Sequence, residues 1–277
     1  MKFGYFCNTT NWTHKPYHKL LDETKQITEY CDQNNWNSIW FTEHHFNHEG
    51  MESCTNPLML GADAAARTEN IRIGQAANVI TFHNPIRLAE DIATLDQLSK
   101  GRVEVGVARG VYGREAINLN KEADLKDQAK NFRLFAETLE ILKKAWSEKF
   151  FNHDGEFYTY PSPNYVWQHD MSPPSEDFMN MEDSTMKKIS VLPKPYQNPH
   201  PPIHQVVDGI RSIEWAAENN INVIMWIPTV KALKIRFEAY KNKRSEVTKK
   251  NVPLGEGVTL VRDMFVADTM EEAKEKA

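Results

Sequence analysis

The stretch IRIGQAANVITFHNPIRLAEDIATLDQLSKGRVEVGVA, residues 71–108, decides the fold class. Its first ten residues and its last eight residues form two short segments that are rich in apolar side chains, which is typical of buried strands. Between them, Leu88, Ile92 and Leu95 recur at helical spacing and predict a helix with one apolar face. A strand, a helix and a second strand in this order predict two parallel strands with the helix packed over them.

The same alternation continues on both sides of this stretch. Further apolar runs, each followed by residues with helical periodicity, lie at 2–7, 37–43, 202–208, 221–227 and 258–268. Together with the two runs above they make seven strands, a number that favours a barrel over a doubly wound sheet. We expect an α/β protein with a TIM (β/α)8-type barrel whose eighth strand is not among the 277 residues.

Residues 151–201 interrupt the alternation between the fourth and fifth strands. They carry Pro, Met and aromatic residues without a sustained period, as in MSPPSEDFMNMEDSTM (171–186). We expect a single domain over residues 1–277, incomplete at its C-terminal end, with 151–201 as an insertion that covers the active site and excludes water.

Composition narrows the class of partner. Lys and Arg number 33 and Asp and Glu 38, so the net charge is −5 and no basic excess is present to bind nucleic acid or an anionic membrane. No apolar run approaches the roughly 20 residues of a transmembrane helix. The three cysteines have no metal-type spacing and are expected to be reduced. We expect a cytoplasmic protein that acts on a small molecule.

The second strand ends in two adjacent histidines, His44 and His45, after Glu43. Active sites of such barrels lie at the C-terminal ends of the strands, and adjacent residues of an extended chain point to opposite sides. Three roles remain open on spacing alone: a structural role, acid/base catalysis, and metal binding by His44 and His48 with His83 or Glu43.

Two later strands end in residues suited to an anion. Arg109 follows the fourth strand among glycines and offers a bidentate fork to phosphate or carboxylate, although a solvated turn explains it equally well. Asp208, Gly209 and Ser212 follow the fifth strand at the start of a helix, whose free N–H groups favour an anion. Helix capping is an equally simple explanation of Asp208 and Ser212.

Four motifs in order carry a resemblance to a known family. They are WFTEHHF (40–46), IGQAANVITFHNPIRLAEDIATLDQLSKGR (73–102), VGVARGVYGRE (105–115) and VVDGIRSIEWAAENNINVIMWI (206–227). This set resembles the bacterial luciferase-like monooxygenases, which are flavin-dependent enzymes with a TIM-barrel fold. The resemblance extends over nearly the whole chain outside the insertion.

The resemblance implies roles for individual residues. It implies that His44 is catalytic with His45 beside it, and that Arg109 binds the flavin phosphate. It also implies a cis peptide bond between Ala76 and Ala77 under the isoalloxazine ring, Trp226 near the flavin, and Asp208, Gly209 and Ser212 near the phosphate. Gly209 lacks the hydroxyl that luciferases carry there, and Ala108 replaces the reactive cysteine of their α-type subunits, which counts against light emission.

The implied activity is an FMN-dependent monooxygenation. Reduced FMN, supplied as a cosubstrate by a separate flavin reductase, would react with dioxygen and oxidise a small, apolar organic substrate through a flavin peroxide in a dry pocket. Relatives associate through the helices after strands two and three, so a dimer is expected. The alternatives are a deazaflavin-dependent oxidoreductase on the same fold, a metal-dependent barrel hydrolase, and a flavin-binding protein without catalysis.

Overall fold

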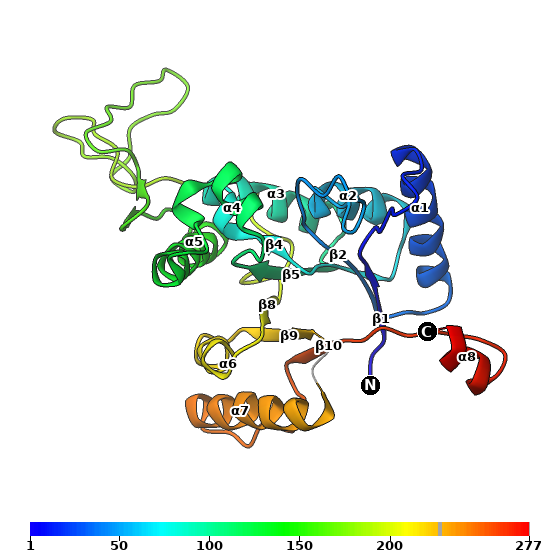
Figure 1. Ribbon diagram of the computed structural model, residues 1–277. Coiled ribbons are helices and arrows are strands. Elements are labelled where there is room, and N and C mark those ends of the chain that lie inside the picture. The colour runs from blue at the N-terminus through cyan, green and yellow to red at the C-terminus, as the bar shows by residue number, and fades with distance from the viewer. Residues whose placement is uncertain (227–228, 277) are drawn as a thin grey trace. The chain divides into compact units, whose positions relative to one another are not determined.

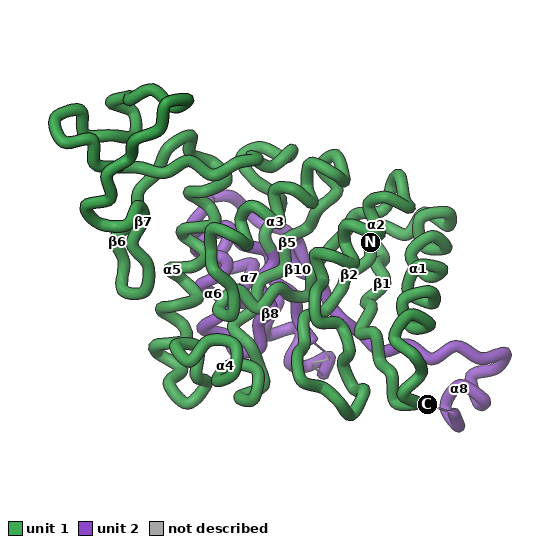
Figure 2. Tube along the Cα trace, turned by 90° about the horizontal axis from the view of Figure 1, so that it is seen from above, with its two compact units in different colours: residues 1–203 green, residues 204–277 purple. Residues whose placement is uncertain are grey.

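The computed structural model describes residues 1–226 and 229–276. The chain forms two compact units, residues 1–203 and 204–277 (Figure 2). Both units contain parallel strands joined through helices, as the α/β prediction requires. In the described residues, no helix has the length and apolar character needed to cross a membrane.

Unit 1 is built on four parallel strands. Their spatial order is β1 (Gly4–Cys7), β2 (Ser38–Phe41), β3 (Arg72–Gln75) and β5 (Val103–Ala108). The short strand β4 (Asn78–Val79) also pairs with β5, in parallel. The run predicted as one strand at 71–80 is therefore two short strands separated by Ala76 and Ala77. All these pairs are parallel, so the C-terminal ends of the strands share one edge.

Helices follow the strands of unit 1 in sequence and pack against one another (Figure 1). They are α1 (Tyr17–Gln33), α2 (Pro57–Arg67), α3 (Pro85–Leu98), α4 (Gly113–Leu119) and α5 (Gln128–Ser147), with the 3-10 turns η1 (Ile80–Phe82) and η2 (Lys121–Ala123). No pattern in the sequence predicted α4. Asn56 and Asn84 accept hydrogen bonds from the first-turn N–H groups of α2 and α3, and a proline follows each cap.

The core of unit 1 lies between the strands and these helices. Ile39, Ile73 and Val105 of the strands are fully buried, as are Ile92 of α3 and Phe135 of α5. Backbones approach closely at Gly106, where an added Cβ would lie only 1.6 Å from the carbonyl oxygen of Gln75. Any side chain at this position would displace the turn between β3 and β4.

Unit 2 contains β8 (Ile203–Val207) except for its first residue, together with β9 (Asn222–Trp226) and β10 (Val258–Val261). The three strands are again parallel, with β9 in the middle. Its helices are α6 (Ile210–Glu218), α7 (Val230–Thr248) and α8 (Met270–Lys276). The predicted strand at 221–227 and the predicted last helix each extend one residue, Ile227 and Ala277, outside the described residues.

The insertion begins with a hairpin and continues as an arm. Strands β6 (His153–Asp154) and β7 (Thr159–Tyr160) are antiparallel. Figures 1 and 2 show residues 161–188 projecting outward beyond α5, and in Figure 2 they extend past the end of α5 that lies away from α4. The arm therefore does not cover the end of unit 1 where α4 lies, contrary to the cover expected for the insertion.

Candidate active site

The two histidines after β2 contact different carboxylates, as their adjacent positions predict. His45 Nε2 lies 3.1 Å from Glu43 Oε1. His44 Nε2 lies 3.4 Å from Glu52 Oε1, and its Nδ1 lies 3.4 Å from Glu115 Oε1. The pair therefore belongs to two polar networks at the C-terminal end of β2, which the backbone of His45 links.

The first network is centred on the buried carboxylate of Glu43, which is 2% exposed. The carboxylate accepts a 2.6 Å hydrogen bond from the Val79 N–H. Besides His45, it also contacts His83, whose Nε2 lies 2.7 Å away. Burial opposes ionisation, but the hydrogen bonds from His45, His83 and Val79 lower the pKa of Glu43. Burial also disfavours the charged form of His83, yet the contact with Glu43 raises its pKa. Glu43 is thus an ionised anchor that ties the loop after β2 to the turn after β4.

The second network surrounds His44. Glu115, the third residue of α4, is fully buried and also accepts a 2.7 Å hydrogen bond from the His45 N–H. The Tyr112 ring packs against the His44 imidazole with centroids 5.4 Å apart. Burial and the neighbouring Glu52 carboxylate raise the pKa of Tyr112 to about 12, so the phenol stays protonated at neutral pH. This network brings an imidazole, two carboxylates and a phenol together, which suits proton transfer.

Ala76 and Ala77 form the turn between β3 and β4. The peptide bond that joins them is cis, the geometry that the resemblance implies. Asn78 Nδ2 donates to Gln75 Oε1 and to the Gly106 carbonyl, which fixes the turn against β5. Gln75 is fully buried, and in the described residues its Nε2 has no hydrogen-bond partner. A buried donor of this kind is available to a bound molecule.

Arg109 follows β5 and is partly buried. Its Nη1 lies 3.3 Å from Gln128 Oε1 and 3.4 Å from Asn131 Oδ1, and the guanidinium stacks over the Phe132 ring. Burial lowers its pKa, and no carboxylate in the described part of the chain forms an ion pair with it. Arg109 is therefore a cation held by neutral groups, which leaves it free to bind an anion.

The predicted residues of unit 2 gather where β8 and β9 end. Gly209 is the N-cap of α6 without a side-chain hydrogen bond, and the Ser212 N–H donates to the Gly209 carbonyl. The side chain of Asp208 is 92% exposed and pairs with Arg236 at 2.7 Å, so Asp208 does not cap the helix. Trp226 ends β9 and is 45% exposed.

The metal alternative is not supported. His48 is 86% exposed and lies beside Glu49, whereas His44 and His83 contact carboxylates of the two networks. Across residues 1–226 and 229–276, no three His, Cys, Asp or Glu side chains form a group that could hold a metal ion.

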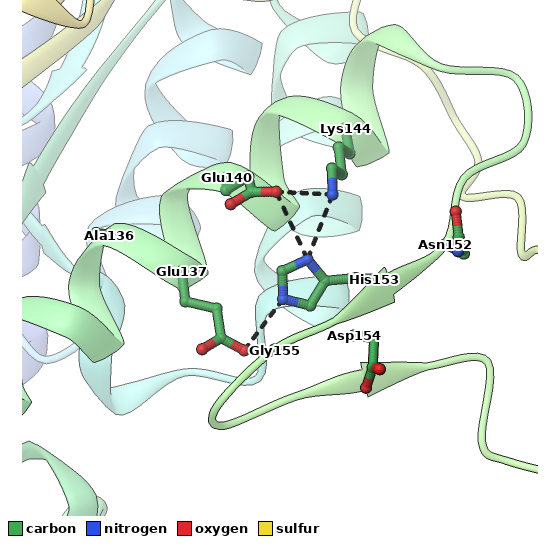
Figure 3. A pocket seen from close by; sticks show the side chains of 8 residues that line it. All are labelled: Ala136, Glu137, Glu140, Lys144, Asn152, His153, Asp154 and Gly155. Atoms are coloured by element: carbon green, nitrogen blue, oxygen red, sulfur yellow. Dashed lines mark hydrogen bonds and ion pairs between the residues drawn. The ribbon is translucent and has the colours of Figure 1, made fainter.

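A polar pocket of about 420 Å³ lies elsewhere, between α5 and the hairpin β6–β7 (Figure 3). His153 Nε2 lies 3.1 Å from Glu137 Oε1, and Glu137 also accepts backbone N–H groups of Glu156, Phe157 and Tyr158. Glu137 therefore holds the hairpin on α5, which explains this cluster structurally.

Glu52 and Glu115 were not among the site residues predicted from the sequence. Glu115 lies in the VGVARGVYGRE motif, six residues beyond Arg109. A helix predicted to begin within this motif would have indicated that Glu115 lies near the end of β5. Glu52 has no such signal, because a loop of irregular conformation brings it to His44.

The profile of the luciferase-like monooxygenase family matches residues 1–277. The chain belongs to this family. It is 26% identical over 280 aligned positions to the oxygenase component of the flavin-dependent trigonelline monooxygenase of Acinetobacter baylyi, covering 99% of this chain and 67% of that protein. It is 30% identical over 225 positions to the alkanal monooxygenase beta chain of Photorhabdus laumondii, covering 81% of this chain.

The solved structures agree on the fold. The oxygenating constituent of 3,6-diketocamphane monooxygenase from Pseudomonas putida, a type II Baeyer–Villiger monooxygenase in complex with FMN, superposes with a TM-score of 0.79 at 22% identity. The match covers 99% of this chain and 70% of that one. The TIM-barrel-type α/β prediction is thereby confirmed. The chain spans only 59% of the alkanal monooxygenase beta chain.

Proposed function

We propose that this protein is the oxygenase component of a two-component FMN-dependent monooxygenase. A separate flavin reductase would supply reduced FMN, and dioxygen would be the second substrate. Family membership supports this proposal, as do the names of its relatives: one is an oxygenase component, and others act on alkanals or on a diketocamphane. Those named substrates favour a small, apolar organic substrate.

The residues present in unit 1 fit a flavin mononucleotide. Arg109, a partly buried cation with neutral partners, would hold the phosphate. Ala76 and Ala77 would leave room for a flat ring system, because their side chains end at Cβ, and Gln75 offers a buried donor without a partner. When bound, reduced FMN supplies the electrons that activate dioxygen.

His44 would serve as the proton donor or acceptor for the substrate. Its Nδ1 is buried beside Glu115, so a substrate cannot reach this nitrogen unless the surrounding core residues move. Its Nε2 lies on the other edge, and the side chain is 15% exposed. Nε2 is therefore the nitrogen that would exchange a proton with a bound molecule. His45 is held by Glu43 and would keep the loop in place.

Asp208, Gly209, Ser212 and Trp226 remain proposed flavin contacts on the resemblance alone. We also propose a cytoplasmic dimer that associates through α2 and α3. Met59 of α2 is 71% exposed and Leu98 at the end of α3 is 61% exposed, so these helices present apolar side chains to solvent.

The observation that carries the proposal is the neutral environment of Arg109. Under anaerobic conditions, titration with reduced FMN should show binding to the parent protein. Arg109→Ala should weaken that binding by roughly 1.5–3 kcal/mol, the scale of a charge-assisted hydrogen bond. Arg133→Ala, which removes an exposed arginine paired with Glu156, is the matched control and should leave the affinity unchanged.

Unchanged FMN affinity in Arg109→Ala would remove this residue from the phosphate site. Binding of a deazaflavin in preference to FMN by the parent would favour the deazaflavin-dependent alternative. His44→Ala should retain FMN affinity and lose turnover by about 10²–10⁴-fold. Turnover at the parent rate would show that His44 is not catalytic.

A further inference from the structure

We infer that Glu52 is the positioning residue of His44: in the ligand-free protein its carboxylate lies 3.4 Å from Nε2 and gives that nitrogen a proton acceptor, which a bound substrate would displace. The inference rests on the proposed function, in which Nε2 is the reacting nitrogen. It concerns a residue that lies in none of the four motifs and that the loop after β2 brings back over His44.

The loop between β2 and α2 is built to place Glu52 there. The His44 N–H donates to the Cys54 carbonyl at 2.8 Å, which closes the loop on itself. Gly50 adopts a positive φ of 85°, and an added Cβ would lie 2.2 Å from the Asn11 carbonyl oxygen. Only glycine allows this turn. A ten-residue excursion therefore returns to its starting point, with Glu52 beside the ring of His44.

A second contact attaches the same loop to α4. Arg114 donates to both carboxylate oxygens of Glu49, at 2.9 and 3.2 Å, and also to Asn47. Since α4 also carries Glu115, the two carboxylates that flank His44 are held relative to each other. The imidazole thus lies between two carboxylates, each 3.4 Å from one of its nitrogens, although Nδ1 has no hydrogen-bond partner in the described residues.

The two carboxylates differ in what they can do. Glu115 is fully buried and is occupied by the backbone N–H of His45. The Glu52 side chain is 14% exposed, whereas that of Glu115 is not exposed at all. The Oε2 atoms of both carboxylates are buried and have no hydrogen-bond partner in the described residues. A proton that leaves His44 Nε2 can pass to Glu52 Oε1 and from there to water, which leaves a neutral imidazole and then restores the carboxylate. Glu115 supplies orientation only.

Tyr112 gives an independent view of the same carboxylate. The Tyr112 ring packs against His44. Burial is the largest cause of its raised pKa of about 12, and the Glu52 carboxylate is the next. If Glu52 lies where the structure has it, Glu52→Gln should lower the pKa of Tyr112 toward its ordinary value of 10. NMR of ¹³C-labelled tyrosine in the ligand-free protein measures this shift.

The decisive test reads His44 directly. In long-range ¹H–¹⁵N spectra of the ligand-free full chain, Glu52→Gln should shift the Nε2 resonance of His44, and the Nδ1 resonance with it, because the two nitrogens share one protonation equilibrium. Glu122→Gln, a surface carboxamide substitution at a residue paired with Lys130, is the control and should shift neither. An unchanged Nε2 resonance in Glu52→Gln would overturn the inference, because the carboxylate would then have no contact with that nitrogen.

The functional arm separates a positioning role from a merely structural one. After anaerobic loading with reduced FMN and admission of air, Glu52→Gln should return oxidised FMN about 10-fold more slowly than the parent, with FMN affinity unchanged. Added formate, a small carboxylate, should restore the rate. A slow rate that formate does not restore, or an unchanged rate, would overturn the proton role. If the parent fails to bind reduced FMN, the proposed function fails, and the NMR result alone decides the placement of Glu52.

Discussion

Replacing Glu43 by glutamine should destabilise unit 1 by about 1.5–4 kcal/mol. The carboxylate accepts from Val79 N–H through one oxygen, and His45 and His83 contact its other oxygen. An amide has only one oxygen. If that oxygen stays with the histidines, the amide nitrogen faces the Val79 N–H and two donors oppose each other.

The magnitude follows from these contacts. A buried N–H left without an acceptor costs about 1–3 kcal/mol. Loss of the negative charge also removes the attraction to His83, but that side chain is 36% exposed, so solvent screening limits this contribution to about 0.5–1 kcal/mol. The sum is roughly 1.5–4 kcal/mol.

The loss should depend on pH in a defined window. The lowered pKa of Glu43 gives stability that is present above its ordinary value of 4.5 and is lost as the pH falls through the folded-state pKa. The raised pKa of His83 gives stability that is fully present below pH 6.5, the ordinary pKa of histidine, and is lost as the pH rises through the folded-state pKa. Both contributions are complete between about pH 4.5 and 6.5, so the difference between parent and variant should be largest there.

Urea unfolding followed by circular dichroism, at pH 5.5 and pH 8, measures this difference. Glu122→Gln is the control, because the Glu122 side chain is 53% exposed. This substitution should change the free energy of unfolding far less than Glu43→Gln does at both pH values. A loss below about 1 kcal/mol for Glu43→Gln at pH 5.5, with an unchanged m-value, would refute the argument that Glu43 is an ionised anchor.

Three further outcomes are expected. Gly106→Ala should abolish soluble folding because of its 1.6 Å contact, whereas Gly209→Ala, with nothing within 4 Å, should fold normally; comparable soluble yields would contradict this. Asn84→Ala should cost about 1 kcal/mol by removing the cap of α3, seen as a melting temperature lower by about 2–4 °C, and an unchanged temperature would show that the cap contributes nothing. Light scattering at micromolar concentration should give a dimer mass, and a monomer mass would count against association through α2 and α3.

Periodicity and caps predicted most of the fold because they are local. The apolar runs at 37–43 and 101–108 contain β2 and β5, and Asn56 with Pro57 begins α2 as expected. The run at 71–80 was only partly predictable. Its composition is continuous, but the cis turn at Ala76 and Ala77 divides it into two strands, and that turn depends on β5 packing beside it. The short helix α4 also escaped prediction, since its seven residues are too few for a clear period.

For the site, the sequence by itself determined the two histidines just beyond β2, their contacts with different groups and the position of Arg109 at the end of β5. These follow from alternation along a strand and from the parallel direction of the strands. Only the tertiary structure decided that Glu52 and Glu115 flank His44 and that Glu43 is shared by His45, His83 and Val79. Glu115 comes from a helix about 70 residues away, and Glu52 from a loop folded by a glycine turn and by an arginine of α4. No local pattern encodes such contacts, because each depends on two segments reaching the same point in space.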